Sequence, residues 1–212
     1  HYVFTSNASE LITVLLGVLF QIPSPLLAVQ ILAIDLGTDV LPSFSLGVEP
    51  EEPENKIRSR SFQKKNNQEG IMGFKGFRRI AYIGTIMATG AVIAFVWSMA
   101  RGGWWFGKAF DPNSVLYIKS TAAAYAVLSF SQMANLLQSR SETLSPFQLG
   151  FFKNKYAIGS IFFSLGVLLL FMYLPFCQKY LHMLPIDYKD WMMVAGTTIA
   201  VFLFEEVRKA ER

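Results

Sequence analysis

The chain has 212 residues, of which 52% are hydrophobic and only 16% charged, and its net charge is +4. Soluble domains carry about 25% charged residues, so an ordinary soluble globular protein is excluded. The modest charge, with Lys and Arg gathered at the ends of apolar runs, argues against nucleic-acid binding and is typical of membrane orientation signals.

Hydropathy and turn residues predict an all-α, polytopic membrane helical bundle with about six transmembrane helices. The predicted spans lie at about 2–20, 25–46, 78–100, 115–138, 155–175 and 190–207. A short turn containing Pro23 and Pro25 joins the first two spans. A charged stretch at 48–76 separates the second from the third, and its weak hydrophobicity indicates a flexible loop.

Basic residues set the expected orientation, because cytoplasmic loops of membrane proteins carry an excess of Lys and Arg. Most of the 19 Lys and Arg residues lie in 48–79, in 139–155 and near the C-terminus. The opposite side and its margins hold Arg101, Lys108, Lys119, Lys179 and Lys189. The bias predicts that the charged loop and the C-terminus face the cytoplasm.

The second span interrupts its apolar sequence with two acids, Asp35 and Asp39, and with Gly37 and Pro42. An ionisable group inside a membrane is costly and is a functional hypothesis by default. Glycine and proline let a helix unwind, and unwound backbone at membrane depth survives only within protein or beside a polar cavity. We therefore expect an unwound segment in which acids and freed carbonyl oxygens surround a hard cation.

The first span brings a second set of polar side chains to a similar depth. Asn7 and Glu10 are three residues apart, and Asp35, Thr38 and Asp39 stand at i, i+3 and i+4. Each set therefore shares one face of a helix. The short turn makes the two spans antiparallel neighbours, so the two sets are expected to meet. Close anions in a low dielectric must bind cations, take up protons, or both.

The fourth span adds Gln132 and Asn135, again three residues apart. They are expected either to complete the cage or to hydrogen-bond between helices. Zinc, copper and iron are disfavoured, because His1 and His182 are isolated and Cys177 is the single cysteine. Oxygen ligands suit Na⁺, K⁺, Ca²⁺ or H⁺. We predict no catalytic residue and no cofactor-binding residue in the chain.

Two motifs carry a family resemblance: Asn-x-x-Glu at 7–10 and Asp-Leu-Gly-Thr-Asp at 35–39. Together they resemble the C-terminal transmembrane region of a type II P-type cation-transporting ATPase, of the sodium–potassium and calcium pump kind and similar to bacterial relatives. The likeness continues through Leu46-Gly-Val-Glu-Pro50, Phe152-Lys-Asn-Lys155 and Glu206-Val-Arg208-Lys209. It covers essentially the whole chain.

The resemblance implies that the spans are the inner part of helix five and helices six to ten of a ten-helix pump, with helix six unwound. Residues 1–46 would be the ion-binding helix pair, 47–77 a cytoplasmic loop, and 78–212 a supporting four-helix membrane bundle. The transported cation would be Na⁺, K⁺ or Ca²⁺. Its implied ligands are Asn7, Glu10, Asp35, Thr38, Asp39, Gln132 and Asn135.

Departures from the family pattern bear on the type of pump. Asp35, where calcium pumps usually carry Asn, makes the segment similar to sodium–potassium pumps. Asn135 stands where the animal sodium–potassium pumps have an acid, and Phe163 and Ser164 replace a further acidic pair. These replacements argue against a third sodium site.

Nothing in the chain resembles the phosphorylation motif Asp-Lys-Thr-Gly-Thr or a nucleotide-binding domain. The chain opens almost at once into an apolar segment, so we expect a fragment that lacks helices one to four and the cytoplasmic domains. ATP and Mg²⁺ would act only through those absent parts. The parent chain, rather than this fragment alone, is expected to be the ATP-driven translocase, integral to the lipid bilayer of the cell (plasma) membrane.

Two other functions stay open at this point. An acid-lined secondary transporter or channel would use the same polar residues without ATP. A non-catalytic, truncated pump homologue acting as an interaction protein would bind a membrane partner and no cation. An upstream reading frame carrying Asp-Lys-Thr-Gly-Thr favours the pump, whereas a nearby start codon favours the alternatives.

Overall fold

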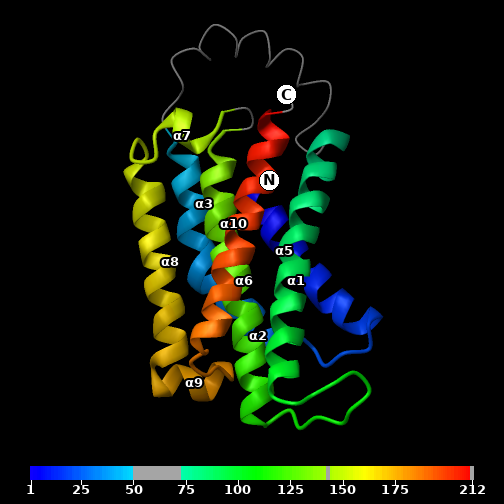
Figure 1. Cartoon of the computed structure of the whole chain (residues 1–212). Coiled ribbons are helices and arrows are strands. Elements are labelled where there is room, and N and C mark those ends of the chain that lie inside the picture. Colours follow the sequence, from blue (N-terminus) through cyan, green and yellow to red (C-terminus); the bar gives the residue numbers. More distant parts are fainter. Residues whose placement is uncertain (50–72, 142–143, 211–212) are drawn as a thin grey trace, which may run out of the picture.

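The structure, a computed structural model, describes residues 1–49, 73–141 and 144–210. Within these ranges every regular element is a helix, as the all-α prediction requires. Figure 1 shows the long helices side by side in one bundle, with α7 and the C-terminus at one end and α9 at the other. The elements are α1 (Tyr2–Leu19), α2 (Ala28–Ala33), η1 (Ile34–Asp39), α3 (Val40–Gly47), α5 (Phe74–Arg101), α6 (Val115–Ser139), α7 (Pro146–Leu149), α8 (Lys155–Tyr173), α9 (Pro175–Leu181) and α10 (Tyr188–Ala210).

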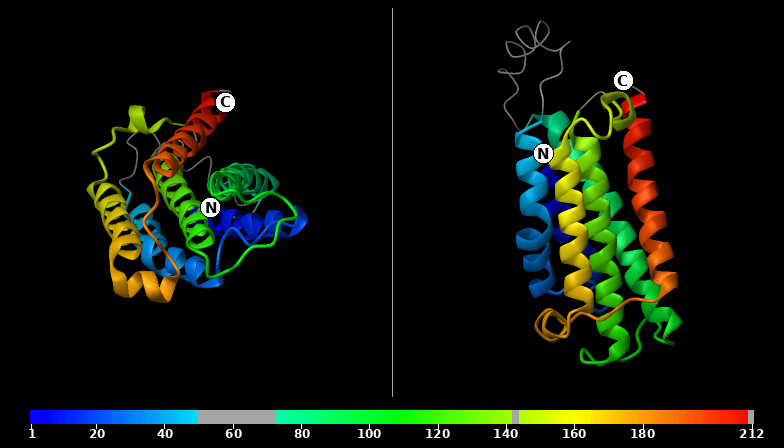
Figure 2. Two further views of the ribbon diagram at one scale, coloured as in Figure 1. Left: turned by 60° about the horizontal axis from the view of Figure 1, so that its bottom comes forward. Right: turned by 90° about the vertical axis from the view of Figure 1, so that its left-hand side faces the viewer.

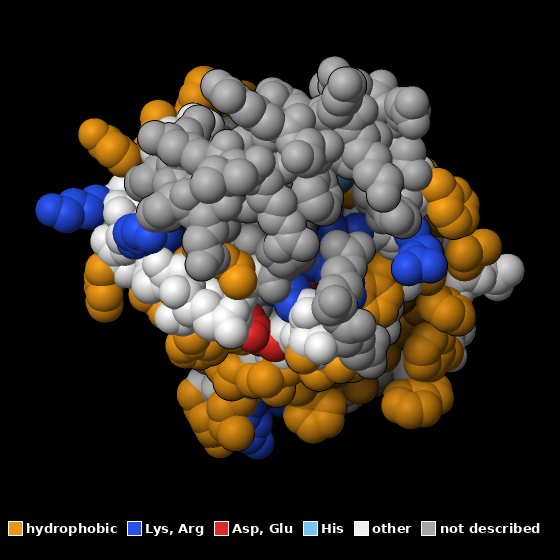
Figure 3. Space-filling view, turned by 90° about the horizontal axis from the view of Figure 1, so that it is seen from above, with side chains coloured by type: hydrophobic (Ala, Val, Ile, Leu, Met, Phe, Trp, Pro, Cys, Tyr) orange, Lys and Arg blue, Asp and Glu red, His pale blue; other side chains and the backbone are white. Residues whose placement is uncertain are grey.

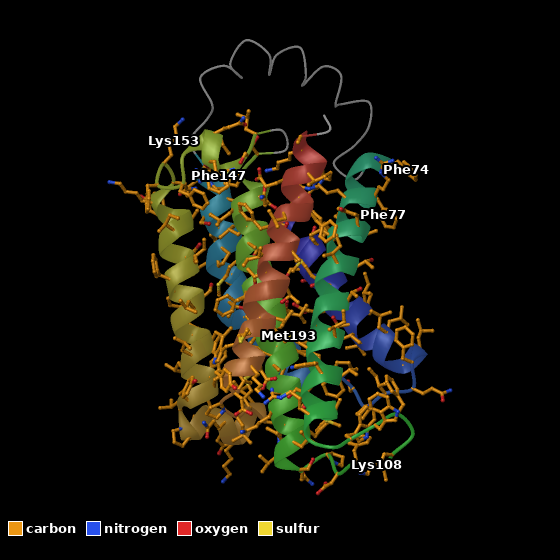
Figure 4. The ribbon with its side chains drawn as sticks, in the orientation of Figure 1. Phe74, Phe77, Lys108, Phe147, Lys153 and Met193 are labelled. Atoms are coloured by element: carbon orange, nitrogen blue, oxygen red, sulfur yellow. The ribbon has the colours of Figure 1, made fainter. Side chains whose placement is uncertain are left out.

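The long helices match the predicted spans apart from their ends. α5 begins at Phe74 rather than near residue 78, so the last residues of the stretch expected as a loop are helical. Basic residues lower the hydropathy there, but Lys and Arg are good helix formers. Figure 4 shows Phe74 and Phe77 on this first turn, at the end of the bundle that also holds Lys153. The rest of the predicted loop, 50–72, lies outside the described residues.

Four stretches are long and apolar enough to cross a membrane: Tyr2–Leu19, Ala28–Gly47, Gly76–Arg101 and Lys155–Tyr173. α6 and α10 have 25 and 23 residues, which is long enough, but the same composition test does not select them. α6 has little need of an apolar surface, because the other helices surround it. A membrane helical bundle is therefore supported, and the number of six crossings stays a prediction.

α6 is the central helix of the bundle. It packs against α1, α3, α5, α8 and α10, and the left view of Figure 2 shows it in the middle of these elements. Its alanine run at 122–124 is fully buried and lets neighbouring helices approach closely, while Tyr125 and Leu128 fill the core. The sequence therefore places small and polar residues on the helix that touches most others.

The outer faces of the bundle are apolar. Leu11, Val18, Phe44, Phe162 and Ile199 are among the large side chains that stay exposed. Seen from one end, hydrophobic side chains form much of the rim of the molecule (Figure 3). Exposed apolar surface on this scale marks contact with lipid or with further protein.

The last turn of α10 is tied to neighbouring helix ends by buried polar groups. The ammonium of Lys209 donates to the carbonyl oxygens of Gln138 and Leu144 at 2.8 and 3.0 Å. Glu205 pairs with Arg79 at 2.9 Å. Burial lowers the pKa of Lys209 to about 8, because desolvation disfavours the charged amine.

We expect Lys209 to make the folded state more stable as the pH rises from 8 towards 10.5. In this window the folded protein has released the lysine proton while the unfolded chain, with an ordinary lysine pKa, retains it. The unfolded state then binds more protons, so stability increases with pH.

The measurement is thermal unfolding in detergent of the parent and of Lys209→Met. The difference in Tm, parent minus variant, should grow with pH, whereas the half-buried Lys119→Met control should show none of this growth. A pH-independent difference for Lys209 would contradict the expectation.

Candidate functional site

One face of α1 carries polar side chains at helical spacing. Tyr2, Ser6, Ser9, Glu10 and Thr13 are all buried. Residues three and four apart are neighbours on a helix surface, so they form one stripe towards the bundle interior. Two of its hydroxyls are satisfied within the helix, because Ser9 and Thr13 donate to carbonyls one turn earlier, both at 2.7 Å. The carboxylate of Glu10, by contrast, is bonded to a side chain of another helix, as described below.

The acids of the second span lie on a π-helix. η1 runs from Ile34 to Asp39 between two short α-helices. The prediction of an unwound segment is therefore corrected: the chain leaves α-geometry where expected but stays helical. A π-helix has i→i+5 hydrogen bonds and is frequently found at functional sites. The hydroxyl of Ser164 on α8 donates to the carbonyl oxygen of Thr38 at 2.7 Å.

Gly37 has a packing role in this segment. A Cβ added there would lie 2.9 Å from Cε2 of Phe171 and 3.1 Å from Cγ1 of Val167. Real Cβ atoms essentially never approach other heavy atoms closer than 3.0 Å. Glycine therefore lets α8 approach the π-helix and hold it in place.

Three carboxylates meet between α1 and η1. Glu10, Asp35 and Asp39 can each offer one oxygen so that the three oxygens lie within 4.8 Å of one another. Glu10 and Asp39 are 3% and 5% exposed, and Asp35 is half-buried. The convergence predicted from helical spacing is therefore present. Buried like charges at this range repel strongly and need compensating positive charge or protons.

Two further residues of α1 orient Asp39. The phenol of Tyr2 donates to its Oδ1 at 3.0 Å, and the hydroxyl of Ser6 donates to its Oδ2. Neither was among the predicted site residues. Their signal was in the sequence, since Tyr2 and Ser6 precede Glu10 at intervals of four residues on one helix face.

Gln132 of α6 joins the cluster from the other side. Its Nε2 donates to Oε1 of Glu10 at 3.0 Å and also to the hydroxyl of Ser6. Asn135, one turn along α6, is buried, and its Oδ1 accepts from Ser139 at 3.4 Å. Of the two predicted α6 residues, the structure therefore brings Gln132 to the carboxylates through a direct hydrogen bond.

The remaining predicted residues, Thr38 and Asn7, differ in burial. Thr38 is buried, and its hydroxyl donates to the carbonyl oxygen of Ile34 at 3.0 Å. Asn7 is exposed on α1, beside the exposed Phe4 and Leu11. The acid cluster is thus enclosed on the side of α6 and α8, while Asn7 and the half-buried Asp35 lie towards the surface.

Several buried polar atoms of α6 lack a hydrogen-bond partner. They include Oε1 of Gln132, Nδ2 of Asn135 and the hydroxyl oxygen of Ser131. Buried polar groups are normally satisfied by protein, water or a ligand. The unpartnered Oε1 of Gln132 is a neutral oxygen available beside Glu10.

The ligand set of this cluster is made of oxygen. Carboxylates, hydroxyls, an amide and backbone carbonyls are the ligands that hard cations prefer. The ion pairs that Lys and Arg form in the described ranges lie at helix ends, with Glu49, Asp187, Asp190 and Glu205. The cluster at mid-bundle therefore has the composition of a site for a hard metal cation.

The comparisons with known proteins agree with this chemistry. The chain is 30% identical over 203 residues to a calcium-transporting ATPase of Bacillus subtilis, covering 95% of this chain and 21% of that protein. It is 28% identical over 234 residues to human sodium/potassium-transporting ATPase subunit alpha-2, and 26% over 239 residues to potassium-transporting ATPase alpha chain 1 of Xenopus laevis. Each covers 98% of this chain, which spans only 22% of either relative.

The family described as "Cation transporting ATPase, C-terminus" matches residues 23–210. The match extends over most of the helical bundle and includes both acids of η1. This chain therefore belongs to the C-terminal membrane region of the P-type cation-transporting ATPases.

Proposed function

We propose that this chain is the part of an ATP-driven pump that carries cations across the membrane, and that Glu10, Asp35 and Asp39 bind the cation. The observation that carries the proposal is the approach of these three carboxylates within 4.8 Å in a chain of this family. Three acids can neutralise one divalent or two monovalent cations, with any remaining carboxyl keeping a proton.

Neutral oxygens complete the proposed cage. Gln132 already touches Glu10 and has a free Oε1, and the hydroxyl of Thr38 lies on the same segment as Asp35 and Asp39. We assign Asn7 and Asn135 to the outer part of the cage, since Asn7 is exposed and the side chain of Asn135 is hydrogen-bonded to Ser139 instead of to a carboxylate of the cluster. Alternating access would then follow from movement of α1 against η1.

We further propose that this chain is one part of a longer pump protein. The chain spans about a fifth of the curated relatives it matches, so helices and cytoplasmic domains of the parent remain to be added. The exposed apolar side chains next to Asn7 give α1 a surface suited to such a helix. ATP and Mg²⁺ would act in the cytoplasmic domains. We place the ends of α3, α6 and α10 at the cytoplasmic face of a plasma membrane, because Lys and Arg concentrate there.

The test is phosphorylation of the full-length protein by ATP, titrated separately with Na⁺, K⁺ and Ca²⁺. We expect one of these cations to stimulate phosphoenzyme formation in a saturable manner. The relatives' names include calcium, potassium and sodium/potassium transport. The titration therefore also identifies which of these cations this pump transports. Absence of phosphoenzyme with every cation would favour a secondary transporter, a channel or a non-catalytic homologue.

Loss of the Tyr2 hydroxyl is expected to weaken cation binding without abolishing it. The phenol is one of two donors that orient Asp39, and a hydrogen bond to a charged group contributes about 1.5–3 kcal/mol. Tyr2→Phe should therefore raise the half-saturating cation concentration at least tenfold in the phosphorylation assay. Tyr82→Phe, at an exposed position on α5, is the matched control and should leave that concentration unchanged.

A further inference from the structure

A second polar cluster lies where α3 ends, and it contains no residue of the proposed cage. Its centre is the guanidinium of Arg140, whose side chain is 0% exposed. Nε and Nη2 donate to the carboxylate of Glu49 at 2.8–3.1 Å, and Nη1 donates to the carbonyl oxygens of Gly150 and Phe151 at 3.2 and 3.3 Å. One buried Arg at the end of α6 thus holds both the end of α3 and the segment before α8.

Asn154 connects the same groups. Its Nδ2 donates to the carbonyl oxygen of Ser45 at 3.0 Å and to the carboxylate of Glu49, while its Oδ1 caps α8 by accepting from Ala157 at 3.0 Å. Six residues further along the chain, on α8, the hydroxyl of Ser160 lies 3.3 Å from that of Ser45. α3 is therefore bonded to α8 and to its cap at successive positions.

The contacts extend from this cluster to the π-helix. Ser164, one turn beyond Ser160, donates to the carbonyl oxygen of Thr38. α3 and η1 both pack along α8. By contrast, in the part of the chain that the structure describes, α1 is bonded to η1 through the side chains of Tyr2 and Ser6, which both donate to Asp39. The backbone that carries the acids is thus bonded to α8, and α1 reaches it through side chains.

We propose that Glu49, Arg140 and Asn154 form a clamp that joins α3 to α8 as one rigid unit, so that the cage opens and closes without movement of α3 relative to α8. Arg140 is then a positioning residue for Asp39. This inference rests on the proposed function and narrows it: of the two helices that supply the acids, the one carrying Asp39 is held still at this end. A buried, doubly bonded Arg–carboxylate pair gives the geometric definition that such a unit needs.

The test adds a covalent bond between α3 and α8 beside the clamp. Ser45→Cys and Ser160→Cys, in a Cys177→Ala background of the full-length pump, place two thiols where hydroxyl oxygens are now 3.3 Å apart, and oxidation then joins them. We expect the oxidised protein to keep cation-stimulated phosphorylation and transport within twofold of the reduced protein. A loss of tenfold or more that reductant reverses would overturn the proposal. Each single cysteine variant controls for oxidation.

The role of Arg140 is tested by rescue. Arg140→Gln should raise the half-saturating cation concentration about tenfold with little change in the maximal phosphoenzyme. The disulfide should return that concentration to within twofold of the parent, which a general loss of stability does not predict. Failure of the oxidised disulfide to rescue a folded Arg140→Gln protein would overturn the positioning role. Lys119→Gln, which removes an exposed ion pair with Asp187, is the control and should change neither value.

Disulfide formation itself gives a readout that does not depend on pumping. If the clamp is rigid, the yield and rate of cross-linking, measured by mass spectrometry, should be the same with Na⁺, K⁺, Ca²⁺ or no added cation. A rate that changes tenfold with cation contradicts the rigid unit. Phosphorylation that responds to no cation in the parent overturns the proposed function instead, and the two failures are thereby separated.

Discussion

Replacement of Asp39 by Asn in the full-length protein is expected to abolish cation-stimulated phosphoenzyme formation while the protein still folds. Asp39 lies at the centre of the cluster, within reach of Glu10 and Asp35, and it accepts hydrogen bonds from Tyr2 and Ser6. Asn keeps the size but removes the charge that a cation requires. The change loses one of the two accepted hydrogen bonds, since the amide nitrogen is a donor, but it relieves repulsion between the acids, so the protein should still fold. Any residual stimulation should require at least a hundredfold higher cation concentration.

The measurements are phosphorylation by ATP against cation concentration, and thermal unfolding in detergent. Asp111→Asn is a suitable control, because Asp111 is an exposed acid in the loop between α5 and α6. The control should behave as the parent in both assays. Stimulation of the Asp39→Asn protein with unchanged cation dependence would remove Asp39 from the site.

Replacement of Gly37 by Val should have an effect of similar size through geometry instead of charge. Even a Cβ would meet the ring of Phe171 at 2.9 Å and Val167 at 3.1 Å, and overpacking costs about 1–3 kcal/mol. The π-helix would have to move away from α8, which displaces Asp35 and Asp39 on either side of Gly37. We expect a large fall in cation-stimulated phosphorylation together with a lower Tm.

A matched control and a compensating change make this prediction specific. Gly47 lies on α3 with no heavy atom within 4 Å of an added Cβ, so Gly47→Val should be close to neutral. Phe171→Ala removes the ring that the new side chain meets, so the double variant Gly37→Val/Phe171→Ala should recover part of the lost cation response. The prediction is contradicted if the double variant recovers no cation response while Phe171→Ala alone is active. Gly37 would then act through something other than its contact with Phe171.

The sequence predicted the fold class and the meeting of three acids because both depend on local patterns. Hydropathy located the long helices, since burial in lipid requires about 20 apolar residues. Helical spacing placed Glu10 on one face of the first span and Asp35 and Asp39 on one face of the second, and their convergence followed from the short turn between them. The motif at 35–39 pointed to the family, which the match over residues 23–210 confirms.

Other features depended on which helix packs against which, and a single sequence does not encode that directly. The sequence predicted unwinding near Gly37, but the structure has a π-helix there, which lies against Phe171 and Ser164 of α8. Arg140 looks like an ordinary orientation signal in the sequence. Only the neighbouring ends of α3 and α8 make it a buried group bonded to Glu49.

By itself, then, the sequence determined that the protein is a helical bundle of membrane composition with acids at mid-span, because hydrophobic length and helical periodicity are properties of single segments. The tertiary structure decided which polar groups surround those acids. Tyr2 and Gln132 touch the carboxylates while Asn7 is exposed, since the position of a helix face depends on packing against its neighbours.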